Sequence, residues 1–97
     1  MSSNVEDITV NYEEDNILIV KELDKVILSK GAWATIIFRF KQWDRKNEKY
    51  GGDCYSIRRY QKRNNIYSQK SKFNISSKDQ AIKIIDALQK WTKEADA

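Results

Sequence analysis

The stretch from residue 57 to residue 75 combines cations, aromatic rings and strand-forming side chains, and it contains no acidic residue. Its two densest parts are Ile57-Arg58-Arg59-Tyr60-Gln61-Lys62-Arg63 and Lys70-Ser71-Lys72-Phe73-Asn74-Ile75. Cations suit the phosphate backbone of a nucleic acid, and flat rings suit unstacked bases. A merely solvated face would usually mix the two signs of charge. The pattern therefore predicts a sheet surface that binds a polyanion.

A neighbouring strand is expected to extend this surface. Between Trp33 and Trp43 the side chains alternate, so that Ala34, Ile36, Phe38 and Phe40 share a core face and Arg39, Lys41 and Trp43 share the other. If adjacent strands pair antiparallel, we expect the outward residues to form one basic surface with aromatic islands. The candidate nucleic-acid-binding residues are Lys30, Arg39, Lys41, Trp43, Arg58, Tyr60, Lys62, Arg63, Lys70 and Lys72.

Several of these residues also fit a structural role. Trp43, like Trp33, suits a cap at the end of the core, and Tyr60 suits a cross-strand aromatic pair. Lys62 fits a charge that keeps a hairpin soluble. Arg59 falls on the nominal core face, so either it lies at the sheet edge or the register shifts there.

Other chemistries have little support in the composition. The chain has no His and one Cys, which leaves no imidazole or thiolate zinc site and removes the commonest general base. Glu13-Glu14-Asp15 lacks the spacing of a calcium loop, and Gly31, Gly51 and Gly52 do not form a phosphate-binding loop. We therefore expect no enzyme activity, no cofactor and no metal.

Length and charge indicate one small domain with an acidic start. Residues 1–24 hold seven acids and one base, a net charge of −6, whereas residues 25–97 carry +10. We expect residues 1–15 to be an acidic, mobile arm and residues 16–97 to be the nucleic-acid-binding domain. The arm could fold back onto the basic body or serve only as a solubilising tail.

The periodicity predicts strands followed by a helix. Apolar or alternating runs lie at residues 17–20, 25–29, 33–43, 54–61 and 67–75, with turn signals at Gly51-Gly52 and Asn64-Asn65. Ser76 or Ser77 then caps a helix. We expect the α+β class, with an antiparallel sheet of about four strands and one C-terminal helix.

The helix carries an apolar stripe that is wide for so small a chain. The candidate dimer-interface residues are Ile82, Ile85, Leu88 and Trp91. Part of the stripe is expected to face a second subunit, and the alternative is a broad contact with the sheet of the same chain.

Taken together, these motifs resemble the family of transcriptional coactivators and single-stranded-DNA-binding proteins typified by eukaryotic positive cofactor four. The resemblance spans residues 26–91. Ile57-Arg58-Arg59-Tyr60 is similar to that family's Ile-Arg-Glu-Tyr strand, and a polar hairpin, the basic strand from Lys70 to Ser76 and a capped helix near Lys78-Asp79-Gln80 follow.

The resemblance implies a homodimer whose helices form the interface and whose curved antiparallel sheets hold opposing single strands of melted DNA. It assigns DNA contacts to Arg58, Tyr60 and Lys72. The Trp that follows the Tyr in the family is Gln61 here, and Trp43 is the candidate replacement. The connection after Trp43 is longer than the family's.

We therefore expect a homodimeric single-stranded-DNA-binding protein of the coactivator type, acting in transcription, replication or recombination. The alternatives are an RNA-binding regulator and a protein-interaction module without nucleic-acid binding. No run is apolar enough to cross a bilayer, and the start lacks a signal pattern. A cytoplasmic location is expected, or a nuclear one in a eukaryotic host.

Overall fold

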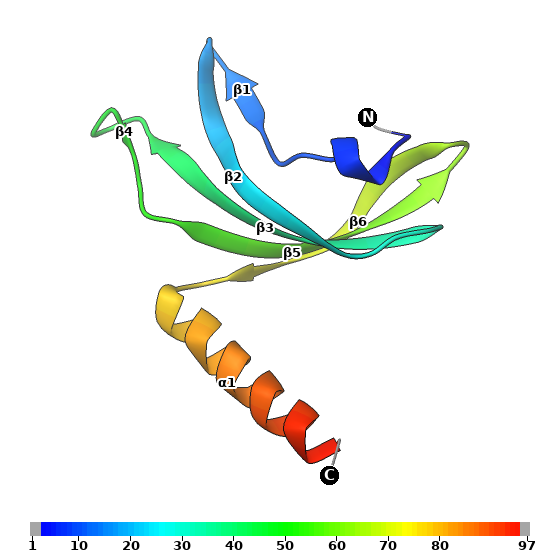
Figure 1. Cartoon of the computed structure of the whole chain (residues 1–97). Coiled ribbons are helices and arrows are strands. Elements are labelled where there is room, and N and C mark those ends of the chain that lie inside the picture. Colours follow the sequence, from blue (N-terminus) through cyan, green and yellow to red (C-terminus); the bar gives the residue numbers. More distant parts are fainter. Residues whose placement is uncertain (1–2, 96–97) are drawn as a thin grey trace.

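The computed structural model describes residues 3–95 and contains a six-stranded antiparallel sheet followed by one helix (Figure 1). The elements are η1 (Val5–Asp7), β1 (Tyr12–Glu14), β2 (Ile17–Ser29), β3 (Trp33–Asp44), β4 (Lys49–Tyr50), β5 (Cys54–Arg63), β6 (Ile66–Ile75) and α1 (Lys78–Ala95). The α+β class with one C-terminal helix is confirmed. The sheet has more than four strands because residues 12–14 and 49–50 add two short ones.

The strands follow the order β1-β2-β3-β5-β6, and β4 pairs with the far end of β3. Tight turns connect both outer hairpins. Asn64 and Asn65, between β5 and β6, have φ angles of 50° and 67°, and Asp15 and Asn16 adopt the same left-handed region between β1 and β2. Such turns match the twist of the flanking strands, and Asn tolerates them well. The expected turn at Asn64-Asn65 is therefore confirmed.

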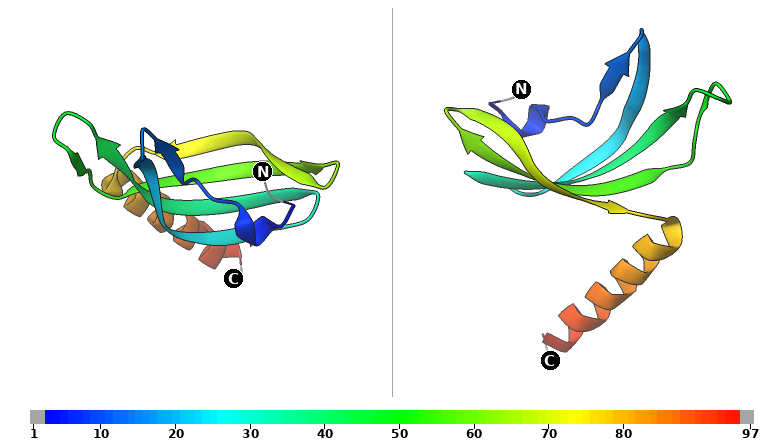
Figure 2. Two further views of the ribbon diagram at one scale, coloured as in Figure 1. Left: turned by 90° about the horizontal axis from the view of Figure 1, so that it is seen from above. Right: turned by 180° about the vertical axis from the view of Figure 1, so that it is seen from behind.

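The sheet is curled, and its two faces differ (Figures 1 and 2). We call the side that carries Ala34, Ile36, Phe38 and Phe40 the concave face; these four residues are buried, as expected. The opposite, convex face carries the odd-numbered residues of β3 from Trp33 to Trp43. The helix and the start of the chain lie on opposite sides of the sheet.

The concave core is covered by the N-terminal segment, residues 4–11, rather than by the helix. Val5, Ile8 and Val10 are each 6% exposed and pack in one cluster with the β3 core residues. The composition predicted a mobile arm over residues 1–15, whereas Val5, Ile8 and Val10 are buried in the structure. Met1 and Ser2 of that arm lie outside the described residues. Glu6 and Asp7 separate Val5 from Ile8, so the segment shows no clear apolar periodicity, and its packing on the core was not predicted from the sequence.

The helix begins at a capped end and then leaves the sheet. The Ser77 hydroxyl accepts a hydrogen bond from the Gln80 amide at 3.1 Å, and the Gln80 side chain accepts one from the Ser76 amide at 2.6 Å. This is a variant of the expected capping box. Beyond its first turns α1 extends away from the convex face (Figure 2). Within residues 3–95, no helix combines the length and the apolar character that a membrane crossing requires.

Candidate nucleic-acid interface

The strand register divides the candidate residues between the two faces of the sheet. Arg58 lies opposite Ile36 and Tyr60 lies opposite Ala34 in the β3–β5 pair. Residues directly opposite each other in an antiparallel pair project to the same side. Arg58 and Tyr60 therefore belong to the concave face, whereas Arg39 and Lys41 belong to the convex one. The prediction of a single basic surface is therefore wrong, because the candidate cations are divided between the two faces.

Arg58 is the centre of a polar network on the concave face. Its Nε donates to the Ser56 hydroxyl at 3.2 Å, and its Nη1 donates to the side-chain oxygen of Gln69 at 3.4 Å. The Ser56 hydroxyl donates in turn to Asn74 at 2.8 Å. The guanidinium also lies 5.9 Å from the centre of the Phe40 ring. These partners hold the side chain in place but are all neutral.

Lys72 lies directly across from Arg58 in the β5–β6 pair and is exposed. We call Ser56, Arg58, Gln69, Lys72 and Asn74 the Arg58 cluster. In the described part of the chain, no carboxylate forms an ion pair with Arg58 or Lys72. Two adjacent cations without an acidic partner favour binding of an external anion.

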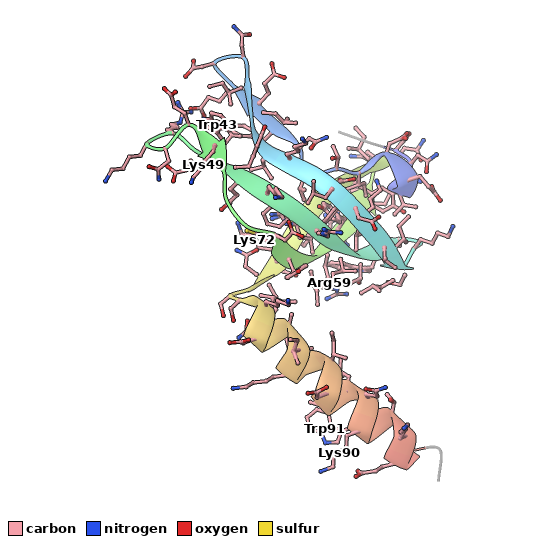
Figure 3. The ribbon with its side chains drawn as sticks, turned by 60° about the vertical axis from the view of Figure 1, so that its left-hand side comes forward. Trp43, Lys49, Arg59, Lys72, Lys90 and Trp91 are labelled. Carbon is pink, nitrogen blue, oxygen red and sulfur yellow. The ribbon has the colours of Figure 1, made fainter. Side chains whose placement is uncertain are left out.

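Two of the convex cations share one acidic partner. Arg39 Nε lies 2.7 Å from Asp53, and Lys41 Nζ lies 3.7 Å from the same carboxylate. Trp43 is half-buried and packs edge-on against Tyr50, with ring centres 5.0 Å apart. Figure 3 shows Trp43 beside the β3–β4 end of the sheet. Trp43 thus lies on the face opposite Arg58 and outside the buried core cluster, so it is neither a stacking platform next to Arg58 nor a cap on that cluster.

The other candidate cations lie at the margins. Lys62 belongs to the concave side and places its ammonium 5.3 Å from the centre of the Tyr67 ring. Lys30 pairs with Glu6 at 3.4 Å. Arg63 precedes the Asn64-Asn65 turn and is exposed. Lys70 is the extra residue of a β-bulge, because Tyr60 pairs with Gln69 while Arg59 pairs with Ser71.

The structure shows which face of the sheet carries Arg59, for which the sequence left a sheet-edge position or a register shift open. It lies opposite Thr35 on the convex face, and its guanidinium stacks 4.5 Å from the centre of the Trp33 ring. Figure 3 shows it on the side of the sheet that faces the helix. By the same alternation Phe73, opposite Ile57, is a convex residue, and its side chain is exposed.

Two tyrosine rings of the concave face are covered. Tyr60 and Tyr67 are each 6% exposed, and Asp7, Ile8 and Thr9 of the N-terminal segment line a cavity of about 460 Å³ together with them. Burial raises the pKa of Tyr60 above its ordinary value, although Arg58 opposes the shift. The Tyr67 hydroxyl donates to the Gly31 carbonyl at 2.6 Å.

Sequence reasoning missed the neutral members of the Arg58 cluster. Ser56 shares the strand parity of Arg58, so alternation alone could have identified it. Gln69 follows from the register of the Asn64-Asn65 turn, since it pairs with Tyr60 before the bulge, whereas the place of Asn74 depends on the bulge at Lys70, which leaves no local signal. No group of three or more metal-ligating side chains gathers within residues 3–95. The arrangement can supply charge, hydrogen-bond donors and buried rings.

Comparisons with protein-family models, with curated proteins and with solved structures found no match for this chain.

Proposed function

We propose that this chain is a homodimeric protein that binds single-stranded DNA through the concave face of its sheet, in the manner of the coactivator family that its sequence resembles. It would hold melted strands during transcription, replication or recombination. The Arg58 cluster would contact phosphates, and the concave tyrosines would contact bases. No cofactor is needed for such binding.

The observation that carries the proposal is the contrast between the two sets of cations. Arg39 and Lys41 share the carboxylate of Asp53, which offsets one of their two charges, whereas no carboxylate within residues 3–95 pairs with the adjacent Arg58 and Lys72. A polyanion is the ligand class that such a pair attracts most strongly. Phe40 and Tyr60 lie near Arg58 but are buried in the free chain; once uncovered, such rings would favour single strands over duplex, because stacking requires unpaired bases.

The homodimer is supported by the unpartnered faces on the convex side. Ile85 and Trp91 are 58% and 62% exposed, and Ile82 and Leu88 are also exposed. The convex face adds the exposed side chains of Val26 and Phe73. The broad helix–sheet contact within one chain is therefore not formed. A second copy would bring an identical apolar helix and sheet face to cover these residues.

The proposal is tested by titrating labelled oligo-dT and a duplex of the same length into the protein at several salt concentrations. We expect tighter binding of oligo-dT and an affinity that falls steeply as salt rises. Equal or better binding of the duplex would contradict the proposal.

RNA is the second candidate ligand, because rings and cations on a sheet serve RNA equally well. Competition between matched DNA and RNA oligonucleotides separates the two. A protein-interaction module would instead leave both oligonucleotides unbound, and the exposed helix would be its contact surface.

A further inference from the structure

The N-terminal segment lies across the half of the concave face that carries Tyr60 and Tyr67. We propose that this segment is an internal competitor of single-stranded DNA: it covers the base-stacking rings in the free protein, and DNA must displace it to reach them. This inference rests on the proposed function and adds a regulatory element to the same site.

The segment is held by contacts that can open without disrupting the sheet. Lys25 Nζ donates to the backbone carbonyls of Glu6 and Ile8 at 2.6 and 2.5 Å. Glu22 accepts hydrogen bonds from the Thr9 hydroxyl at 2.7 Å and from the Val10 amide at 3.4 Å. None of these bonds belongs to the ladders that join β2, β3, β5 and β6. The segment can therefore detach while β2, β3, β5 and β6 stay paired, and its detachment uncovers the β3 core residues that Val5, Ile8 and Val10 pack against.

The covered and uncovered parts of the concave face differ in chemistry. Lys72 and Gln69 of the Arg58 cluster are exposed, so phosphates can reach the cations while the segment is in place. Tyr60 and Tyr67 are buried in one cluster with Val5, Ile8 and Val10. In the free protein, phosphates can thus reach Lys72 while Tyr60 and Tyr67 offer no stacking surface, and phosphate contacts alone do not distinguish single strands from duplex. Preference for single strands would arise only when the segment lifts.

The charge of the segment fits a competitor of DNA. Glu6 and Asp7 of η1 bring two carboxylates to this segment, and Glu6 pairs with Lys30 of the β2–β3 connection. Asp7 borders the cavity beside Tyr60 and Gln69. A tethered anion of this kind competes at a high effective concentration. Apparent affinity for DNA is then reduced by the fraction of molecules in which the rings are free.

The first test weakens the anchor of the segment without altering the Arg58 cluster. Ile8→Ser removes a buried apolar contact, and Ile66→Ser makes the same chemical change at an exposed position beside the β5–β6 turn. We expect Ile8→Ser to bind oligo-dT about tenfold more tightly than the unmodified chain, because the open fraction rises. Ile66→Ser should bind as the unmodified chain does. Equal affinity of both variants for oligo-dT overturns the inference and leaves the proposed function standing.

The second test uses the unmodified chain and does not depend on the stability of a variant. The Asp7 and Ile8 amides are hydrogen-bonded to the carbonyls of Asn4 and Val5 at 3.0 and 3.2 Å. Saturating oligo-dT should accelerate hydrogen exchange over residues 5–10 while slowing it near Arg58. Unchanged or slower exchange over residues 5–10, with protection near Arg58, overturns the inference alone. Absence of any binding overturns both the inference and the proposed function.

Discussion

Arg58 and Arg39 come from neighbouring strands and have the same charge, but their surroundings give them different roles. Arg39 forms an ion pair with Asp53. Arg58 is oriented by hydrogen bonds to the neutral side chains of Ser56 and Gln69, so its positive charge is not offset by a carboxylate. A short side-chain network that fixes a guanidinium without neutralising it is suited to recognising phosphate. The residue type alone does not reveal this difference.

We expect Arg58→Ala and Lys72→Ala each to weaken oligo-dT binding by about tenfold, the effect of losing one charge-assisted hydrogen bond. The slope of log K against log salt should become shallower by about 0.7 for each lost phosphate contact. Arg39→Ala is the matched control, since it removes an already paired cation. Fluorescence anisotropy at several salt concentrations measures all three. A loss for Arg39→Ala as large as that for Arg58→Ala would move the site to the convex face.

Tyr60 should make the stability of the protein depend on alkaline pH. Burial raises the pKa of its hydroxyl above 10.0, so the folded chain holds the proton more tightly than the unfolded chain does. The resulting stabilisation is complete below about pH 10 and is lost as the pH rises through the folded-state pKa. Urea unfolding at pH 8 to 11 should therefore show a decline in the free energy of unfolding that is smaller in Tyr60→Phe. Identical pH profiles for the two proteins would show that Tyr60 ionises without cost.

At the scale of elements, local patterns predicted what each segment is but not how segments face one another. The alternation in β3 and the Ser-capped start of α1 are local signals, and both were read correctly. The relative parity of β3 and β5 is set across residues 45–53, where β4 and Gly51-Gly52 interrupt the connection. No residue in that stretch determines whether the even-numbered residues of β5 share a face with the even-numbered or the odd-numbered residues of β3. The division of the cations between the two faces could therefore not be predicted.

The helix should be the element that joins two chains. Ile85→Glu places a carboxylate in the middle of the apolar stripe, where a partner helix would have to bury it. We expect this variant to be monomeric by light scattering at micromolar concentration, while the unmodified protein is dimeric. Lys83→Glu introduces the same side chain on the opposite side of the helix and should remain dimeric. If light scattering shows that the unmodified protein is a monomer, the proposed dimer is contradicted.

At the scale of the whole molecule, the chain is more extended than a typical globular domain of its length. Its radius of gyration is 15.6 Å, compared with about 13 Å expected for a compact domain of 100 residues. The difference reflects the helix, which projects from the convex side without covering it (Figure 2). Apolar surface that a chain cannot cover by itself is the usual reason for association.

Thermal stability should therefore depend on protein concentration. If two chains cover each other's helices, dilution favours dissociation, and the exposed chains unfold more readily. We expect the Tm of the unmodified protein to rise with concentration and that of Ile85→Glu to stay constant at a lower value. Differential scanning fluorimetry over a hundredfold dilution measures both. A Tm of the unmodified protein that is independent of concentration would indicate that the monomer is stable as it stands.

The bulge at Lys70 has a consequence for how this gene can change. With Lys70 looped out, Lys72 lies beside Arg58; a register that absorbed Lys70 into the ladder would place Lys72 opposite Ile57 and Phe73 opposite Ser56. One sequence thus holds two alignments that differ by a single step. Loss of the codon for Lys70 would leave every pair on both sides of the bulge intact and abolish the competing alignment. In this strand, a deletion should be tolerated better than many substitutions.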